Sequence, residues 1–570
     1  MSKHVVVIGA VALGPKAACR FKRLDPTAKV TMIDQAPRIS YGGCGIPYYI
    51  SGEVNNIKEL QATPYNTVRD PEFFRINKDV DAMVNTRATA INRAEHTVDI
   101  EDVVTGERKT LSYDKLVFAL GSKANRPPIE GIDLEGITPV TNLEEAEAVR
   151  TALESRKVKN AVIIGGGFIG LEMAVALADM WGTETSLIEL ADQVMPGFVS
   201  KGMNMMIQND LAKNGVTVYT GEKAVRFEGE NGHVCRVVTD NRTLDAELVI
   251  MAAGIAPNTA IAREAGIEVD GRGTIIVDEY MRTSDPDIYA GGDCVTIPHL
   301  VADKPWFFPL GSMANRQGRI IGTNLAGGSE TFKGGVGSWC VKLFSTAAAG
   351  VGLTIEGAKR LGLDAISVQM AQLDRAHFYP EKSMINLHLV VEKPTRRILG
   401  LQGFSADGAA LLARINTVAA MLQIGKPTVA DICTAEVAYS PPFASAMDVL
   451  NNAGNVADNM LSGQARLIGA DEFAELWANR ENSNDYFADS RLLAGAVALM
   501  EKYPGEWHSI PEEDVEKLLA DIPKDRRLVL MCNTGLRSYD TQLILEKFGI
   551  TNTLSVGGGM TAVRAMGKEF

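Results

Sequence analysis

Short apolar runs alternate with glycine turns and amphipathic stretches along this chain. In "HVVVIGAVALGPKAACRFKRL" (residues 4–24) an apolar run leads through glycines into a stretch with helical periodicity, and "KVTMID" then ends in Asp34. The same order returns in "NAVIIGGGFIGLEMAVAL" (residues 160–177), followed by "TSLIEL". Short continuous apolar runs followed by a helix are typical of buried parallel strands in βαβ units. The pattern therefore predicts two such units.

Further apolar runs end in small residues. "LVFALGS" (residues 116–122) and "LVIMAAGIAPN" (residues 248–258) read as buried strands, and "TSDPDIYAGGDC" (residues 283–294) reads as a strand that ends in Gly-Gly-Asp. In "RILGLQGFSADGAALLARINTVAAML" a strand is followed by a turn and a long helix, after a glycine-rich crossing at residues 327–337. This third region is therefore mixed α/β.

The pattern restarts near residue 468, after a short polar connector at residues 462–467. A helix, a strand and a second helix come before the strand at residues 527–531, which delivers Cys532 into a loop that opens another helix. A last strand and a glycine turn close the segment. A chain of 570 residues is too long for one core. We expect domains at residues 1–150 with 250–328, at 151–249, at 329–460 and at 468–570.

The composition is that of an ordinary soluble protein, with 46% hydrophobic and 22% charged residues. The net charge of −13 argues against nucleic acid as the main partner. No apolar run reaches the roughly 20 residues of a membrane span, and the opening reads as a strand rather than a signal peptide. The seven cysteines are scattered without a CxxC motif or a Cys/His cluster. We therefore expect no metal site and a reducing, cytoplasmic location.

The first glycine turn is a degenerate dinucleotide motif. Gly9 would make the tight turn and Gly14 would let helix and strand approach, but Val11 occupies the place of the usual middle glycine. The helix N-terminus would face a pyrophosphate, and Asp34 would take a ribose hydroxyl. The sequence offers no reason for Leu13 in this loop.

The second glycine turn is complete. Gly165, Gly167 and Gly170 follow an apolar strand and open a helix, and Glu189 ends the next strand. A carboxylate there accepts from a 2′-hydroxyl and repels a 2′-phosphate, which favours NADH over NADPH.

Two dinucleotide folds and a Gly-Gly-Asp segment resemble the flavoprotein disulfide reductases over about residues 1–454. The resemblance implies an α/β fold with two Rossmann-like domains, for FAD and NAD(P)H, and an α+β dimerisation domain in a homodimer. The cofactor-binding positions that we expect are Gly9, Val11, Ala12, Gly14, Asp34, Ser40, Gly121, Gly165, Gly167, Gly170, Glu189, Gly254 and Asp293.

Cys44 stands alone in "SYGGCGIPYYISGE", whereas most of these reductases carry two cysteines about four residues apart. The segment resembles the single-cysteine branch, which comprises coenzyme A disulfide reductases, NADH oxidases and persulfide reductases fused to a rhodanese domain. A lone cysteine beside a flavin must find its partner sulfur in the substrate. The alternative is a buried structural thiol.

The first glycine loop, "GAVALGPKAA", lacks the histidine of the oxidases and resembles the coenzyme A branch. The resemblance implies that Arg20, Arg23 and Ser40 bind coenzyme A, although basic residues on a helix are often only solvated. In "VAYSPPFASAMDVLNNAG" it implies that Tyr439 reaches the partner subunit's cysteine site. Tyr379, in a Phe-Tyr-Pro triplet, is its companion; either tyrosine could instead only pack a loop.

Cys532 lies in "CNTGLRS", between a strand and a helix. Backbone N–H groups, the helix dipole and Arg537 would favour its thiolate. The loop resembles the rhodanese active site, with four residues between Cys532 and Arg537, and Asp489 and Arg491 resemble that family's Asp-x-Arg strand end. The stretch at residues 492–511 matches loosely, so an inert rhodanese fold is the alternative.

Together these features predict an FAD enzyme that uses NAD(P)H to reduce sulfur–sulfur bonds through Cys44. Coenzyme A persulfide, polysulfide and coenzyme A disulfide all remain open as substrates. The C-terminal domain would handle sulfane sulfur at Cys532. The alternatives are an NADH oxidase, a flavin and thiol redox sensor, and a sulfurtransferase with a regulatory flavoprotein part.

Overall fold

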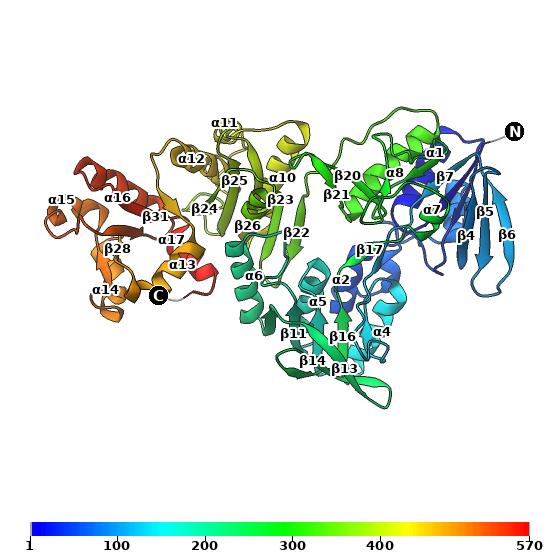
Figure 1. Cartoon of the computed structure of the whole chain (residues 1–570), viewed down its shortest axis with the longest axis horizontal. Coiled ribbons are helices and arrows are strands. Elements are labelled where there is room, and N and C mark those ends of the chain that lie inside the picture. Colours follow the sequence, from blue (N-terminus) through cyan, green and yellow to red (C-terminus); the bar gives the residue numbers. More distant parts are fainter. Residues whose placement is uncertain (1–2, 569–570) are drawn as a thin grey trace. The chain divides into compact units, whose positions relative to one another are not determined.

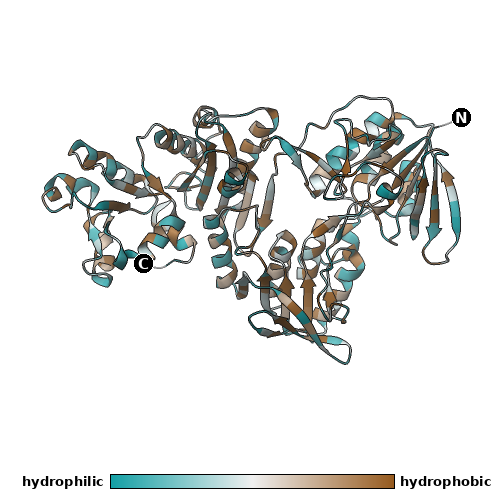
Figure 2. Ribbon diagram, in the orientation of Figure 1, coloured by the Kyte–Doolittle hydropathy of each residue, from teal (hydrophilic) through white to brown (hydrophobic). Residues whose placement is uncertain are grey.

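A computed structural model describes residues 3–568. The chain divides into two compact units, Met1–Leu190 with Tyr219–Gly335, and Ala191–Val218 with Val336–Phe570 (Figure 1). Both units contain β-sheets with helices packed on them, and hydrophobic residues concentrate on the strands of the sheets (Figure 2).

The first unit contains both βαβ units. In the first sheet the strand order is β19 (Ile288–Ala290), β7 (Lys115–Phe118), β1 (His4–Ile8), β2 (Lys29–Ile33) and β3 (Asp81–Met83), all parallel. In the second sheet β11 (Glu184–Glu189), β10 (Asn160–Ile164), β16 (Leu248–Met251) and β9 (Ile137–Thr138) lie in this order and are also parallel. Four consecutive positions of β1 are buried, because helices or loops cover both faces of a parallel sheet.

The helices of this unit surround the two sheets. They are α1 (Leu13–Leu24), α2 (Ile46–Ser51), α3 (Pro71–Lys78), α4 (Leu143–Glu154), α5 (Phe168–Asp179), α7 (Ala260–Glu264) and α8 (Gly311–Leu325). Smaller sheets pair β4 (Thr86–Asn92) with β5 (Thr97–Asp102) and β6 (Arg108–Ser112), and β13 (Ala224–Glu230) with β14 (His233–Thr239) and β15 (Thr243–Asp245). Others pair β8 (Ser122–Ala124) with β17 (Ile255–Pro257), and β18 (Ile275–Ile276) with β20 (Val295–His299) and β21 (Lys304–Trp306). The packing of α2 against α4 and α5 connects the two dinucleotide folds.

The second unit holds an antiparallel sheet and a parallel one. The antiparallel order is β22 (Trp339–Lys342), β23 (Ala347–Gly352), β26 (Ile398–Ser405), β25 (Met384–Glu392) and β24 (Ala365–Leu373). The helices of this part are α6 (Lys201–Lys213), α9 (Ile355–Arg360), α10 (Gly408–Ile424), α11 (Val429–Cys433) and α12 (Val449–Leu461).

The C-terminal sheet is parallel, with the order β27 (Leu467–Ile468), β31 (Thr553–Val556), β30 (Arg527–Met531), β28 (Asp485–Asp489) and β29 (Trp507–Ser509). Its helices are α13 (Ala470–Ala478), α14 (Leu493–Lys502), α15 (Val515–Leu518), α16 (Leu536–Lys547) and α17 (Gly559–Ala565). Helix α17 packs against β24, and α13 and α17 pack against α6. The C-terminal domain is therefore docked on its neighbours as well as tethered to them.

Candidate functional site

The first glycine loop forms a tight turn after β1. A Cβ atom on Gly9 would lie 2.1 Å from the Ala119 carbonyl oxygen, and one on Gly14 would lie 1.9 Å from the Gly9 carbonyl oxygen. Helix α1 then begins after Ala12 without a side-chain cap. Its first N–H groups are therefore available to an anion such as a pyrophosphate.

Two half-buried carboxylates lie beside this loop. Asp34 accepts the Ala10 N–H at 2.7 Å, and Asp293 accepts the Ser122 hydroxyl at 3.0 Å. Burial raises the pKa of both carboxyl groups. Gly121 adopts φ +64°, a left-handed conformation that glycine tolerates without strain. A ligand that carries hydroxyl groups and a pyrophosphate, as FAD does, fits this donor and acceptor set, and Asp34, Asp293 and the α1 N-terminus would hold it.

Leu13, which the sequence left unexplained, has a packing role. Its side chain is buried, and its Cδ1 atom would lie 2.5 Å from a Cβ on Gly291. Leucine at the start of α1 thus fills the space that glycine leaves beside Asp293.

The second glycine loop repeats this geometry. A Cβ on Gly165 would lie 2.2 Å from the Ala252 carbonyl oxygen, whereas one on Gly167 would meet no atom within 4 Å. Glu189, at the end of β11, accepts the Gly166 N–H at 2.6 Å. No protein atom fills the space beside Gly167, so a second dinucleotide can occupy it.

Gly170 and Gly254 support this loop from either side. A Cβ on Gly170 would lie 1.9 Å from the Gly165 carbonyl oxygen, so glycine permits the close packing of α5 on β10. Gly254 adopts φ +84° after β16. Both positions are conformational requirements of the fold at the expected NAD site.

Cys44 lies in the short 3₁₀ turn Gly43–Gly45 that leads into α2, and its side chain is exposed. Partial desolvation of the sulfur raises the pKa of its thiol, and the carboxylates of Glu172 and Asp293 raise it further. Glu172 belongs to α5 of the second dinucleotide fold, and Asp293 follows β19 of the first. The lone cysteine therefore lies where the two folds meet.

Ser40 connects the cysteine segment to the first glycine loop. It is buried, and its N–H donates to the Ala10 carbonyl oxygen at 2.7 Å. Its φ of +51° is uncommon for a residue other than glycine, asparagine or aspartate. Such strain is frequent at functional sites, and here it turns the chain toward Cys44.

The two candidate arginines on α1 differ in their surroundings. Arg20 donates from Nε to the Thr323 hydroxyl at 3.0 Å, and its stem would touch a Cβ on Gly322. Arg23 is exposed. Burial raises the pKa of the nearby Cys19 thiol, and the positive charge of Arg23 opposes this rise. Arg23 is thus the freer of the two for a phosphate.

Tyr379 and Tyr439 belong to the second unit. Tyr439 is 52% exposed and Tyr379 is half-buried. Arg414 of α10 holds both tyrosine-bearing segments: Nη2 donates to the Asp374 carbonyl oxygen at 3.0 Å and to the Phe443 carbonyl oxygen at 3.4 Å. Its buried ion pair with Asp448, at 2.6 Å, completes the clamp.

Cys532 follows β30 and is 2% exposed. Its Sγ accepts the Gly535 N–H at 3.1 Å and lies 3.6 Å from the Ser538 hydroxyl. Ser538 also pairs with the Ser555 hydroxyl at 2.7 Å, and both serines are fully buried. The sulfur therefore accepts hydrogen bonds from a backbone amide and from one hydroxyl group, which a second hydroxyl group holds in place.

The charged residues near Cys532 are arranged in separate pairs. Asp489 is fully buried and pairs with Arg491 at 2.7 Å. Arg537 is exposed and lies near Glu512. Burial and neighbouring acids raise the pKa of the Glu512 carboxyl group, and the positive charge of Arg537 opposes this rise. The hydrogen bonds to the sulfur come from Gly535 and Ser538, and Arg537 is not among the donors.

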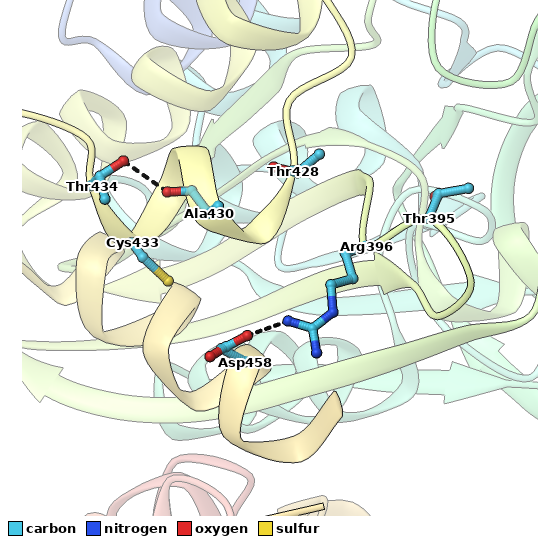
Figure 3. Close-up of a pocket in the computed structure, with 7 residues that line it drawn as sticks. All are labelled: Thr395, Arg396, Thr428, Ala430, Cys433, Thr434 and Asp458. Carbon is cyan, nitrogen blue, oxygen red and sulfur yellow. Dashed lines mark hydrogen bonds and ion pairs between the residues drawn. The ribbon is translucent and has the colours of Figure 1, made fainter. Parts of the chain in front are cut away.

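A separate pocket of about 340 Å³ lies between the turn before β26, α11 and α12 (Figure 3). Arg396 and Asp458 form an ion pair across it, and Thr434 donates to the Ala430 carbonyl oxygen at 2.8 Å. Its lining residues are Thr395, Arg396, Thr428, Ala430, Cys433, Thr434 and Asp458. None of the sequence-derived candidates lines this pocket.

Three features of the site were missed in the sequence. Glu172 had a local signal, since it lies two residues after Gly170 on the helix that the glycine motif opens. Arg414 and the Ser538–Ser555 pair had none, because their roles depend on contacts between distant segments.

Two further kinds of feature are absent from residues 3–568. No group of three or more His, Cys, Asp or Glu side chains is placed to hold a metal ion. In the same range, no helix is both long enough and apolar enough to cross a membrane.

Comparison with known families gives three matches. Residues 3–304 match the family described as "Pyridine nucleotide-disulphide oxidoreductase", residues 340–450 match its dimerisation domain, and residues 455–566 match the rhodanese-like domain.

Individual relatives match over most of their length. The chain is 34% identical to the NAD(P)H coenzyme A polysulfide/persulfide reductase of Pyrococcus horikoshii over 79% of this chain and 97% of that protein. The structure of an NAD-dependent persulfide reductase from A. fulgidus is similar over 98% of this chain and 99% of that one, with a TM-score of 0.92 and 36% identity. An FAD-dependent pyridine nucleotide-disulphide oxidoreductase from Desulfovibrio vulgaris is similar over 80% and 100%, with a TM-score of 0.66 and 59% identity. Proteins named NADH oxidase also match, for example that of Enterococcus faecalis at 31% identity.

Proposed function

The chain belongs to the pyridine nucleotide-disulphide oxidoreductase family, and on that premise we propose that it uses NAD(P)H to reduce sulfur–sulfur bonds through Cys44. The substrates are coenzyme A persulfide, polysulfide or coenzyme A disulfide, in line with the names of its relatives. The similarity to a persulfide reductase extends over 98% of the chain, so it includes the C-terminal domain.

The observation that carries this proposal is the position of Cys44. It is an exposed thiol at the place where the two dinucleotide folds meet, beside Glu172 and Asp293. Within residues 3–568 no disulfide joins Cys44 to another cysteine. The second sulfur of its redox cycle therefore comes from the substrate.

FAD, held by the first glycine loop, Asp34 and Asp293, would supply two-electron transfer from a nicotinamide dinucleotide bound at the second loop. Glu189 orients the dinucleotide through a ribose hydroxyl. Ser40 fixes the approach of the Cys44 segment to the first loop.

Cys44 performs the sulfur chemistry. Its thiolate attacks the sulfane sulfur of a persulfide, a Cys44–sulfur bond forms, and the carrier leaves as a thiolate. Two electrons then break the new sulfur–sulfur bond, which releases sulfide and restores Cys44. With coenzyme A disulfide, the same attack gives a mixed disulfide and one free thiol.

The remaining residues of the site have supporting roles. Arg23, with Arg20, would bind the phosphates of coenzyme A, and Tyr439 with Tyr379 would approach the cysteine site of the partner subunit in a homodimer. Arg414 supports this by holding both tyrosine-bearing segments. The singly placed cysteines, without a CxxC pair, suit a reducing cytoplasm.

Cys532 would accept and release sulfane sulfur on the C-terminal domain. Its Sγ receives the hydrogen bonds that stabilise a thiolate or a persulfide anion, from Gly535 and Ser538. Because both cysteines belong to one chain, the tether raises the effective concentration of this sulfur site at the reductase.

The second candidate is an NADH oxidase, since proteins of that name are also relatives. The sequence of the first glycine loop argues against it, because Ala10 and Ala12 stand where the oxidases carry a histidine. A redox sensor is a third possibility that turnover would exclude, because a sensor is reduced once whereas an enzyme consumes NADH in proportion to substrate.

The decisive experiment follows anaerobic NADH consumption with coenzyme A persulfide or polysulfide, in the wild type and in Cys44→Ser and Cys532→Ser. We expect turnover with release of sulfide, its loss in Cys44→Ser, and a donor-dependent decrease in Cys532→Ser. NADH consumption that requires oxygen and survives Cys44→Ser would establish an oxidase instead.

A further inference from the structure

The sulfur of Cys532 is held by uncharged groups. The two donors within reach of Sγ are the Gly535 N–H and the Ser538 hydroxyl. The Ser538 hydroxyl group is hydrogen-bonded to that of Ser555. A donor that enters this site therefore meets dipoles rather than a guanidinium at the reacting sulfur.

The nearby cations are largely occupied by acids. Arg491 donates from Nε and Nη2 to the fully buried carboxylate of Asp489, and the Trp507 indole N–H lies 3.4 Å from the same carboxylate. Arg537 makes no ion pair in the part of the chain that the structure describes, but it lies near enough to Glu512 for their charges to interact. Strong binding of a small dianion requires cations that are free to pair with it, and this loop offers one at most.

Acidic residues border the same edge of the sheet. Glu512 follows β29 at the carboxyl end of the strands, and its segment (Glu512–Asp514) packs against α16, whose first turn carries Arg537. Burial, then Asp540, then Glu513 raise the pKa of Glu512, so these three carboxyl groups are close enough to repel one another. Asp540 is itself half-buried on α16.

Three exposed leucines lie at the same edge. Leu536, next to the cysteine loop, is 67% exposed, and Leu492 and Leu493 at the end of β28 are 54% and 53% exposed. Strands β28 and β30 are neighbours in register, with Asp489 opposite Met531, so these leucines and Cys532 emerge at one edge. An apolar border suits an uncharged aliphatic arm better than an inorganic anion.

We infer that the Cys532 site selects sulfur donors by charge, accepting sulfane sulfur from an uncharged thiol arm of the pantetheine type and rejecting dianions such as thiosulfate. Glu512 and Asp540 are the residues that determine this specificity, and Leu536, Leu492 and Leu493 receive the arm. The inference rests on the proposed function, because it names the donor class of the sulfur site assigned there.

The transfer step is balanced without a further reagent. The Cys532 thiolate attacks the outer sulfur of R–S–SH, a bond between Cys532 Sγ and that sulfur forms, and the sulfur–sulfur bond of the donor breaks. The arm leaves as R–S⁻ and takes up a proton, and the sulfane sulfur keeps its oxidation state throughout. Thiosulfate would undergo the same exchange with sulfite as the leaving group.

The test measures loading of Cys532 in the full-length protein without NADH. Pantetheine persulfide and thiosulfate are compared as donors, with the mass increase of one sulfur atom on the Cys532 peptide and thiocyanate formation with cyanide as readouts. We expect the wild type to favour pantetheine persulfide by about a hundredfold in kcat/KM, because several like charges oppose the dianion. Added salt should accelerate only the thiosulfate reaction, since it screens that repulsion.

Two isosteric substitutions assign the residues. Glu512→Gln combined with Asp540→Asn should raise kcat/KM for thiosulfate about tenfold and change the pantetheine persulfide value less than twofold. Asp525→Asn is the matched control, because Asp525 lies before β30 at the opposite end of the strands. Equal loading by both donors in the wild type, or an unchanged donor ratio in the double variant, would overturn the inference.

The outcome is independent of the reductase activity. Loading of Cys532 needs neither NADH nor Cys44, so charge selection can hold when sulfide release fails, and that result would count against the proposed function alone. Sulfide release that depends on Cys44, combined with equal use of both donors at Cys532, would count against this inference alone.

Discussion

The carboxylate of Glu189 accepts a 2.6 Å hydrogen bond from the backbone N–H of Gly166. The first fold contains the same relationship, in which Asp34 accepts the N–H of Ala10 at 2.7 Å. In both folds the acid that ends the second strand is tied to the residue directly after the first glycine. Each carboxylate is thereby fixed beside its glycine loop, where a ribose would lie.

This geometry predicts the choice of nicotinamide dinucleotide. Glu189→Gln keeps an oxygen that can accept the Gly166 N–H but removes the charge that opposes a 2′-phosphate. We expect the NADH-to-NADPH ratio of kcat/KM to fall about tenfold, which corresponds to about 1.4 kcal/mol. Steady-state kinetics with both dinucleotides measures it, and Glu184→Gln at the exposed start of β11 is the control. An unchanged ratio would mean that Glu189 does not read the ribose.

The reactivity of Cys44 should depend on Glu172. The negative charge of Glu172 contributes to the raised pKa of the Cys44 thiol, so Glu172→Gln should lower that pKa and increase the thiolate fraction at pH 8. We expect alkylation of Cys44 by iodoacetamide, followed peptide by peptide with mass spectrometry, to become about threefold faster. Asp179→Asn, on the exposed end of α5, should leave the rate unchanged. A slower rate in Glu172→Gln would contradict the assignment.

Glu172 also predicts a pH dependence of stability. Burial raises the pKa of its carboxyl group to about 7, from 4.5. The folded state therefore binds this proton more tightly than the unfolded state, and the carboxylate costs stability as the pH rises through this interval, by at most about 3.4 kcal/mol. Glu172→Gln should melt at a higher temperature than the wild type at pH 8, and the difference should shrink toward pH 5. Thermal unfolding across this range, with Asp179→Asn in parallel, tests the sign.

Arg414 should control the order of both tyrosine-bearing segments. Arg414→Lys keeps a positive charge beside Asp448, but a single ammonium cannot reproduce the planar set of bonds to Asp448 and to the Asp374 and Phe443 carbonyl oxygens. We expect faster proteolysis and faster hydrogen exchange at residues 374–380 and 439–447, with a lower kcat for sulfur reduction. Arg360→Lys on the surface of α9 is the control. Unchanged exchange in both segments would exclude the clamp.

Ser538 should stabilise the sulfur at Cys532. Ser538→Ala removes the hydroxyl 3.6 Å from Sγ and leaves Ser555 without its partner. A lost hydrogen bond to an anion costs about 1.5–3 kcal/mol, so transfer of sulfur to cyanide should fall at least tenfold. Ser462→Ala, in the exposed connector, should have no effect. Full activity in Ser538→Ala would show that the Gly535 N–H alone suffices.

The sequence predicted the parts of this molecule that depend on short-range pattern. The strands and helices around Gly9, Gly165 and Cys532 lie where the apolar runs and glycine turns indicated, because each βαβ unit is specified within about thirty residues. The 3₁₀ turn at Cys44 and the helix α2 that follows it were not among the predictions, and Pro47 lies in the first turn of α2, where proline is tolerated.

The remaining features depend on tertiary contacts. Glu172 affects Cys44 because α5 of one fold packs against α2 of the other, a contact that no local pattern encodes. Arg414 connects segments 40 and 29 residues away. The polar connector predicted a tether, yet Gly557 packs so closely on β24 that an added Cβ would lie 2.4 Å from the Gln369 carbonyl oxygen.

Gln369 offers a test of whether docking matters beyond tethering. Its side-chain oxygen accepts the Ala470 N–H at 2.9 Å, and its side-chain nitrogen donates to the Asp471 carboxylate at 2.7 Å. Gln369→Ala removes both bonds at the start of α13 without adding volume, and should cost about 1–3 kcal/mol because two polar groups lose their partners. We expect faster proteolysis of residues 462–467 and faster hydrogen exchange in α13 and α17, while loading of Cys532 with sulfur continues. Gln423→Ala, exposed on α10, is the control. If proteolysis of the connector is as slow as in the wild type, the close contacts of the glycines alone hold the domain in place. If the connector is cut faster while Cys532 still takes up sulfur, docking of the domain is independent of the chemistry of the cysteine loop.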